Sequence, residues 1–96
     1  MHIDHLPFLR RRRFRRADEE FRANADTLAW LTIRLLPAPD QLEQFRPRFD
    51  KLFRRQEQLL DIMRATRTDK TDCSFAYDCL LHDWLGGALD KLGYWW

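Results

Sequence analysis

A repeat of large side chains between Asp40 and Arg67 constrains the fold more than any other part of the sequence. Its members recur at alternating steps of three and four residues: Leu42, Phe45, Phe49, Leu52, Gln56, Leu59 and Met63. This spacing places them on one face of an α-helix, and a seam of three heptads is typical of a helix that packs along its length against another helix. The segment 40–67 is therefore predicted to be an amphipathic helix.

The preceding segment carries a second seam of the same period. Its members are Phe14, Ala17, Phe21, Asn24, Leu28, Leu31 and Leu35. The pattern predicts a helix over about residues 5–36, which ends at 37–40 because the prolines there cannot continue it. Since only four residues connect two long helices, we expect an antiparallel hairpin.

Three details of this hairpin follow from single residues. Asp40 and Glu43 have the spacing of a capping box at the start of the second helix. Pro47 predicts a kink in that helix, or else a helix that begins only at Pro47. The polar members of the two seams, Asn24 and Gln56, are expected to come close enough to share a buried hydrogen bond.

A third helix is predicted over residues 72–92, ended by Gly93. Its apolar residues define a broad face that we expect to lie on the hairpin: Phe75, Tyr77, Leu80, Leu81, Trp84, Leu85, Ala88, Leu89 and Leu92. Gly86 and Gly87 mark either a close helix approach or a break. The predicted fold is all-α, a single-domain antiparallel three-helix bundle over 1–96 that consists of a long helical hairpin and a shorter C-terminal helix. Leftover apolar surface leaves a homodimer open.

Charge is segregated along the chain. Residues 1–16 carry a net charge of +5, from six arginines against Asp4, whereas residues 71–96 carry −3. In an antiparallel hairpin the start of the first helix lies beside the end of the second, so nine cations should gather there. They are Arg10, Arg11, Arg12, Arg13, Arg15, Arg16, Arg64, Arg67 and Lys70. Glu19 and Glu20 are expected to pair with Arg15 and Arg16, four residues earlier.

This basic end is predicted to contact phosphates, because guanidinium groups neutralise the nucleic-acid backbone and release counterions. Phe8 and Phe14 could add base stacking. No motif for base-specific reading is present. The function predicted is therefore a non-enzymatic accessory or regulatory protein that docks onto nucleic acid or a nucleoprotein complex. The alternative is a protein-binding adaptor or inhibitor that uses the same basic end on an acidic protein surface, or uses the acidic aromatic C-terminus.

Two blander interpretations of the arginines stay open. Fourteen of the seventeen basic residues are arginine, and GC-rich coding gives the same excess without any function, which would leave an inert solvated face. A membrane-surface role is the other interpretation, because Leu6, Phe8 and Leu9 adjoin the basic run.

Tyr94, Trp95 and Trp96 are candidates for a partner-binding anchor, because Tyr and Trp are enriched at interface hot spots. The alternative is that these side chains cover the core of a small domain.

Neither a metal site nor a catalytic site is predicted. Asp78, Cys79, His82 and Asp83 have helical spacing, but a structural zinc site requires four ligands, mostly Cys and His in paired spacings. Polar residues on a helix surface are the favoured interpretation, and no cofactor is expected. No phosphate loop, nucleophile elbow or HExxH motif is present, so the protein is not expected to be an enzyme.

The cellular setting predicted is the cytoplasm. Two cysteines, Cys73 and Cys79, without a secretory pattern favour reduced thiols. No run approaches the roughly 18 to 20 apolar residues of a membrane span.

Overall fold

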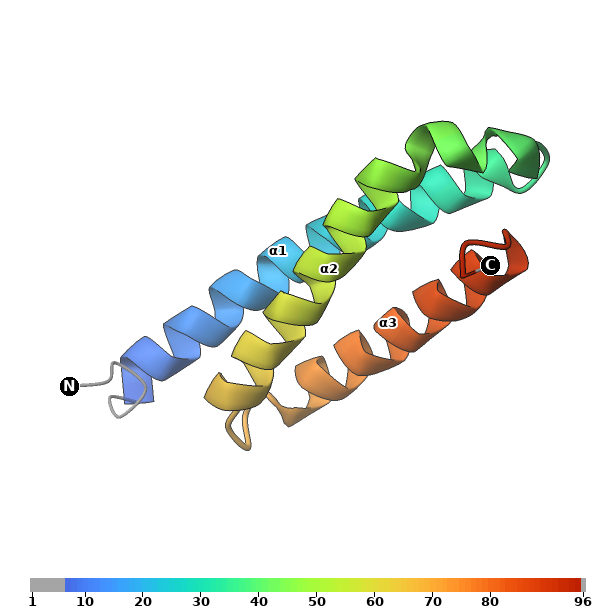
Figure 1. Cartoon of the computed structure of the whole chain (residues 1–96). Helices are drawn as coiled ribbons and strands as arrows, with labels where there is room; N and C mark the ends of the chain where they lie inside the picture. Colours follow the sequence, from blue (N-terminus) through green and yellow to red (C-terminus); the bar gives the residue numbers. More distant parts are fainter. Residues whose placement is uncertain (1–6, 96) are drawn as a thin grey trace.

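The computed structural model describes residues 7–95 as three long helices (Figure 1). They are α1 (Pro7–Leu35), α2 (Leu42–Thr66) and α3 (Asp72–Lys91), and a short 3-10 helix, η2 (Pro39–Gln41), connects α1 to α2. Helices α1 and α2 form the antiparallel hairpin, and α3 returns alongside them in the direction of α1. No strand occurs between residues 7 and 95. The prediction of an all-α three-helix bundle is confirmed.

The bundle is elongated, with extents of 48 × 24 × 19 Å. Helix α3 packs more extensively on α1 than on α2, and Figure 1 shows α3 beside the hairpin. The start of α1 lies at the same end as the connection between α2 and α3. Within the described part of the chain, no helix combines the length and hydropathy that crossing a membrane requires.

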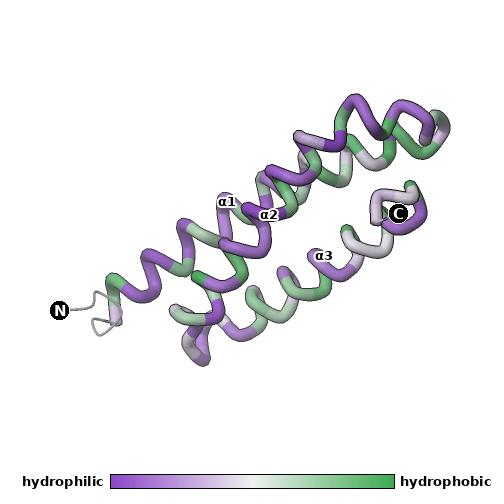
Figure 2. Tube along the Cα trace, viewed as in Figure 1, coloured by the Kyte–Doolittle hydropathy of each residue, from purple (hydrophilic) through white to green (hydrophobic). Residues whose placement is uncertain are grey.

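The core consists of two apolar clusters along the bundle, and Figure 2 shows hydrophobic residues recurring along all three helices. The cluster near η2 contains Ala25, Leu28, Leu31, Leu35, Leu42, Phe49, Phe53, Leu85, Leu89, Leu92 and Tyr94. The cluster near the start of α1 contains Phe14, Ala17, Phe21, Leu59, Leu60, Met63 and Phe75. Most members are predicted seam positions. Phe53 was not predicted to lie in the core, and its ring stacks on that of His82 of α3 with the ring centroids 4.6 Å apart.

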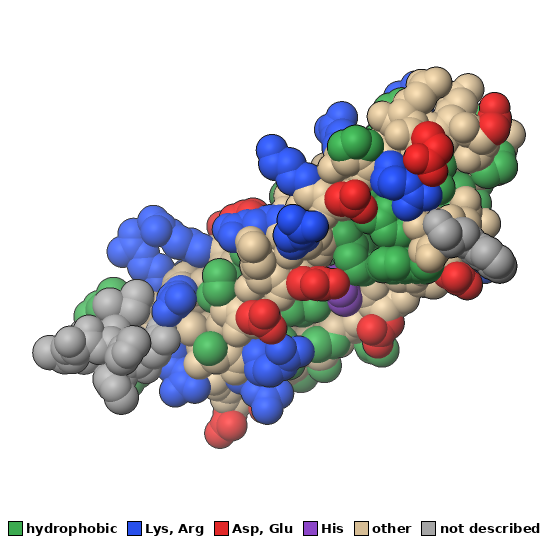
Figure 3. Space-filling model, viewed as in Figure 1, with side chains coloured by type: hydrophobic (Ala, Val, Ile, Leu, Met, Phe, Trp, Pro, Cys, Tyr) green, Lys and Arg blue, Asp and Glu red, His purple; other side chains and the backbone are tan. Residues whose placement is uncertain are grey.

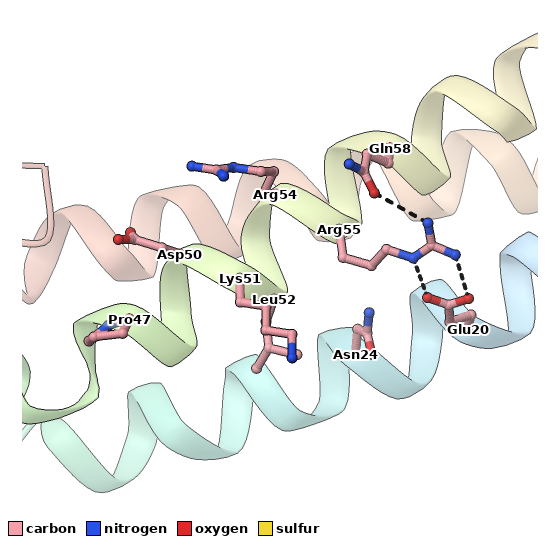
Figure 4. A pocket seen from close by; sticks show the side chains of 9 residues that line it. All are labelled: Glu20, Asn24, Pro47, Asp50, Lys51, Leu52, Arg54, Arg55 and Gln58. Carbon is pink, nitrogen blue, oxygen red and sulfur yellow. Dashed lines mark hydrogen bonds and ion pairs between the residues drawn. The ribbon is translucent and has the colours of Figure 1, made fainter.

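The predicted hydrogen bond between Asn24 and Gln56 is wrong. Gln56 is fully buried, and neither polar atom of its side chain has a hydrogen-bond partner among the described residues. Asn24 instead lies on the flank of α1, in a groove beside Glu20 and Arg55 (Figure 4). Ala25 takes the inward position that was expected for Asn24.

The start of α2 also differs from the prediction. Asp40 lies inside η2 and makes no capping hydrogen bond, while the Glu43 carboxylate accepts a hydrogen bond from Arg46 Nε at 3.0 Å. The capping box does not form because Pro39 already begins helical structure before Asp40. Helix α2 then runs continuously through Pro47, so the alternative of a helix that begins at Pro47 is wrong.

Charged side chains tie the helices together across their flanks. Both carboxylate oxygens of Glu20 accept hydrogen bonds from Arg55 of α2, at 2.5 and 2.9 Å (Figure 4). Glu20 was expected to pair with Arg16 within α1, but it faces α2 and pairs across the hairpin instead. On the other flank of α1, Arg22 Nε lies 3.3 Å from a carboxylate oxygen of Asp78 on α3.

Only half of the apolar face of α3 is covered. Phe75, Leu85 and Leu89 are buried, whereas Tyr77, Leu80 and Trp84 are exposed by 56%, 69% and 55%. The expectation that the whole face lies on the hairpin is therefore wrong, because two helices offer α3 a groove narrower than its apolar face.

The glycines of α3 behave in two ways. Gly86 and Gly87 lie within the continuous helix and do not break it. Gly93 has a φ of 80° and follows the end of α3, as predicted for a residue that terminates a helix.

Candidate functional site

The basic end is where the hairpin brings distant arginines together. Arg10 Nη2 donates a hydrogen bond to the carbonyl oxygen of Arg67 at 3.1 Å, which joins the first turns of α1 to the end of α2. Residues 7–16 and 61–74 together contain nine basic and three acidic side chains. Figure 3 shows basic side chains projecting on several sides of this end. The end therefore carries a concentrated positive charge.

The cations of this end divide into two groups, and the first is an open surface on α1. Phe8, Arg11, Arg12 and Arg15 line a shallow hollow of about 320 Å³. A second hollow, of about 260 Å³, brings Lys70 from the α2–α3 connection beside Arg11 and Arg15. All five side chains are exposed. We call these five residues the cationic face.

The second group lies over an aromatic ring at the α2–α3 connection. The guanidinium carbons of Arg64 and Arg67 lie 5.9 and 5.3 Å from the centre of the Phe75 ring. Arg64 also forms an ion pair with Asp61 at 2.9 Å. These contacts hold α3 to α2 by cation–π attraction, so Arg64 and Arg67 do not line the hollows of the cationic face.

The remaining predicted arginines lie on other sides of α1. Arg16 is exposed one turn after Arg12, while Arg13 is partly buried. Phe14 is only 3% exposed because it belongs to the core seam, so the expectation that it stacks on bases is wrong. Phe8 is 63% exposed.

Tyr94, one of the predicted partner-binding residues, lies in the core. It is 7% exposed, and its ring packs against Phe49 with centroids 6.0 Å apart. Its hydroxyl donates to the Asp50 carboxylate, and its carbonyl oxygen accepts from Arg46 Nη1 at 2.6 Å. Burial and the bond to Asp50 raise the pKa of Tyr94 to about 12. These contacts match the alternative in which the aromatic tail covers the core.

Trp95 is half exposed and lies against α3. Its Nε1 donates to the Gly86 carbonyl oxygen at 3.2 Å, and its ring meets Phe53 edge-on at 5.5 Å. Trp96 lies outside the described residues. Trp95 thus holds the chain end onto the bundle while presenting 53% of its surface to solvent.

The most perturbed ionisable group is Asp78, which sequence reasoning placed on a surface. The side chain is fully buried between α3 and α1, near Asp18 and Arg22. Burial, together with the neighbouring Asp18 carboxylate, raises the pKa of Asp78 to about 8. Arg22 Nε thus donates a hydrogen bond to Asp18 and lies near Asp78, whose raised pKa favours its protonated form.

Sequence alone could have found this burial. Phe75, Asp78, His82, Leu85 and Leu89 are spaced by three and four residues, so Asp78 falls on the inward stripe of α3.

The other predicted polar residues of α3 point in different directions. His82 stacks on Phe53, and burial lowers its pKa. Burial raises the pKa of the Cys79 thiol, and Asp83 is exposed. Among the residues the structure describes, no three His, Cys, Asp or Glu side chains are grouped to hold a metal ion.

A polar groove of about 730 Å³ extends along the hairpin between α1 and α2 (Figure 4). Both carboxylates that line the groove have partners: Glu20 forms an ion pair with Arg55, and Asp50 accepts a hydrogen bond from the Tyr94 hydroxyl. The groove also contains Lys51 and Arg54, which form no ion pair with the described residues. It therefore continues a weaker positive surface along α2, away from the cationic face.

Comparison of the chain with protein-family models, with curated proteins and with solved structures gives no match.

Proposed function

We propose that the protein docks onto nucleic acid through the cationic face and binds phosphates without base specificity. The observation that carries this proposal is the exposed ring of Phe8 among Arg11, Arg12 and Arg15. Guanidinium groups bind phosphates and release counterions, and an exposed aromatic ring offers a stacking platform to any base. This combination suits a single strand, whose bases are free to stack.

The charge balance of the face supports the proposal. Asp18 is the one carboxylate that lines its two hollows, and it forms an ion pair with Arg22 at 3.1 Å. Arg11 and Arg15 lie about 6 Å apart along the helix axis. With Lys70 beside them, we expect the face to contact about three or four phosphates of one strand.

An acidic protein surface is the competing partner for the same face. Both partners would lose affinity when the arginines are removed, so removal alone does not separate them. Phosphate binding differs in its salt dependence, because the logarithm of the affinity falls in proportion to the number of phosphates neutralised. A slope of about −2 to −3 is expected for three or four phosphates on a single strand.

The test is fluorescence anisotropy with labelled single-stranded and duplex DNA and RNA across a salt series. Two triple variants carry the same net charge. One removes Arg11, Arg12 and Arg15, and the control removes the exposed Arg34, Arg48 and Arg54 far from the cationic face. We expect the first triple to lower affinity at least about tenfold and to flatten the salt slope, while the control changes both much less.

Phe8→Ala tests the stacking step separately. Loss of a base–aromatic stack of about 1–3 kcal/mol should weaken single-strand binding about 5- to 150-fold. Duplex binding should change less, because its bases are not free to stack. Absence of binding at low salt, or equal losses in both triple variants, would refute the proposal.

A further inference from the structure

Helix α3 carries an exposed seam that the rest of the described chain leaves largely open, apart from the Arg22 guanidinium, whose carbon lies 5.0 Å from the centre of the Tyr77 ring. Tyr77, Leu80, Trp84 and Gly87 follow one another at steps of three and four residues, and Cys73 and Lys91 extend the same row. All of them are exposed. Alternating steps of three and four are the spacing of a helix that packs against another helix.

The seam borders an apolar groove between α3 and α1. The groove has a volume of about 290 Å³. It is lined by Thr32, Ile33, Leu36, Trp84, Gly87, Ala88 and Lys91. Ile33 and Leu36 are 55% and 48% exposed, so α1 adds apolar surface next to the seam of α3.

Gly87 has no explanation within a single chain. It lies in helical backbone, and a β-carbon at this position would meet no atom within 4 Å. Glycine weakens a helix relative to alanine, so neither backbone geometry nor packing inside one copy requires it. Gly86 has the same open space, and Gly87 differs from it in lying on the exposed row, where a second molecule can approach closely.

We propose that this face binds a second copy of the chain, with the two α3 helices antiparallel about a two-fold axis near residue 82. In this register Leu80 packs against Trp84 of the second copy, and Tyr77 lies over Gly87 of the second copy. At each end of the contact, the large Tyr77 side chain of one copy thus lies over Gly87 of the other copy, which has no side chain. This arrangement accounts for Gly87 and for the exposure of Tyr77, Leu80 and Trp84.

The surface available is adequate for such a contact. Ile33, Leu36, Tyr77, Leu80 and Trp84 together expose on the order of 600 Å². A standard stable interface buries about 800 Å² from each partner. The seam and the adjoining apolar residues of α1 therefore supply most of the area that each copy must contribute, and the polar rim supplies the rest.

The charges at the ends of the seam fit the same register. Lys91 of one copy approaches Asp72 of the other, which gives two symmetric ion pairs. Asp83 lies close to the axis and faces Asp83 of the second copy, so like charges oppose association there. Because salt screens the two ion pairs as well as this repulsion, we expect the dimer to depend only weakly on salt. Phosphate binding would weaken under the same conditions.

Sedimentation equilibrium of the full chain tests the proposal with a matched pair of glycine variants. Gly86 also has open space around its β-carbon position, but it lies off the seam, beside Trp95. We expect Gly87→Ala to weaken the dimer about tenfold, because the added methyl group overpacks the contact with Tyr77. Gly86→Ala should leave the dissociation constant within about twofold.

Leu80→Arg gives a second route to the same conclusion. Leu80 is 69% exposed, so the arginine should leave the helical circular dichroism of the single copy unchanged while abolishing the dimer. A chain that stays monomeric to about 100 µM, or a dimer that neither Leu80→Arg nor Gly87→Ala weakens, would overturn the proposal.

Cross-linking tests the register. Lys91→Cys in a Cys79→Ser background should form an intermolecular disulfide with the native Cys73 of the second copy, because these positions face each other in the antiparallel pair. Glu57→Cys, exposed on α2, is the control and should not cross-link efficiently. Cross-linking that is equal in both variants would refute the antiparallel α3 contact.

Discussion

The buried carboxyl group of Asp78 makes the stability of the bundle depend on pH in a direction opposite to that of most aspartates. In the folded chain its pKa is raised to about 8, whereas in the unfolded chain it returns to the ordinary value of 3.8. Between these values the folded state holds a proton that the unfolded state has released. Stability should therefore fall as pH rises, and should level off above pH 8.

The size of the effect follows from this difference in proton binding. One proton contributes a slope of about 1.36 kcal/mol per pH unit. Between pH 6.5 and pH 8 the free energy of unfolding should fall by about 1.6 kcal/mol, because the difference in bound protons shrinks to one half at pH 8. Above pH 6.5 His82 adds little, since its pKa is lowered by burial and it is neutral in both states across most of this window.

Urea denaturation followed by far-UV circular dichroism, at several pH values from 6.5 to 9, measures this slope. Asp78→Asn keeps the shape of the side chain and cannot ionise, so its stability should change little between pH 6.5 and 8 and should exceed that of the parent chain at pH 9. Above pH 8 the raised pKa of the Cys79 thiol should lower the stability of parent and variant alike. Asp83→Asn, on the exposed side of the same helix, is the matched control and should keep the parent's slope. A parent chain as stable at pH 9 as at pH 6.5, together with an Asp78→Asn variant less stable at pH 9, would show that Asp78 is ionised and paired with Arg22.

Three further substitutions probe the core and its flanks, and each can be measured by urea denaturation at pH 7. Gln56→Met should raise stability by about 1–3 kcal/mol, because it removes a buried amide without hydrogen-bond partners at similar volume; a loss of stability would mean that the amide is satisfied in solution. Glu20→Gln should cost no more than about 1 kcal/mol, because the pair with Arg55 is nearly half exposed, and a double-mutant cycle with Arg55→Gln isolates the pair. Tyr94→Phe should cost about 1 kcal/mol through loss of the hydrogen bond to Asp50, and an unchanged midpoint would contradict this bond.

The hairpin could be predicted from the sequence because burial follows the seam, as Phe14, Phe21 and Leu28 show on α1. The failures have identifiable causes. A straight helix drifts by about 20° per heptad relative to a 3.5-residue repeat, and Ala25 takes the inward position in place of Asn24. At the start of α2, one proline moved the beginning of helical structure and displaced Asp40 from its expected cap.

For α3 and for the basic end, the features that the sequence did not predict have a different cause. The apolar residues of α3 cover more of its circumference than two helices can bury, and no sequence pattern says which half is left open. The gathering of cations followed from hairpin topology, and Arg10 does contact Arg67. The basic residues divide into two groups, because the Phe75 ring of α3 draws Arg64 and Arg67 away from Arg11, Arg12 and Arg15. The sequence pattern does not predict the position of this ring.

The two proposed contacts use different residues and differ in how strongly they depend on salt. The cationic face gathers guanidinium groups at one end of the bundle, whereas the α3 seam is apolar and brings Asp83 against itself along the side. Rising salt competes with phosphate binding, whereas at the α3 contact it screens both the Lys91–Asp72 pairs and the Asp83 repulsion, so self-association should change little. A single salt series that follows both nucleic-acid anisotropy and sedimentation therefore separates the two contacts without any variant. Loss of both signals together would mean that self-association is itself held by the arginines and that the α3 register is wrong.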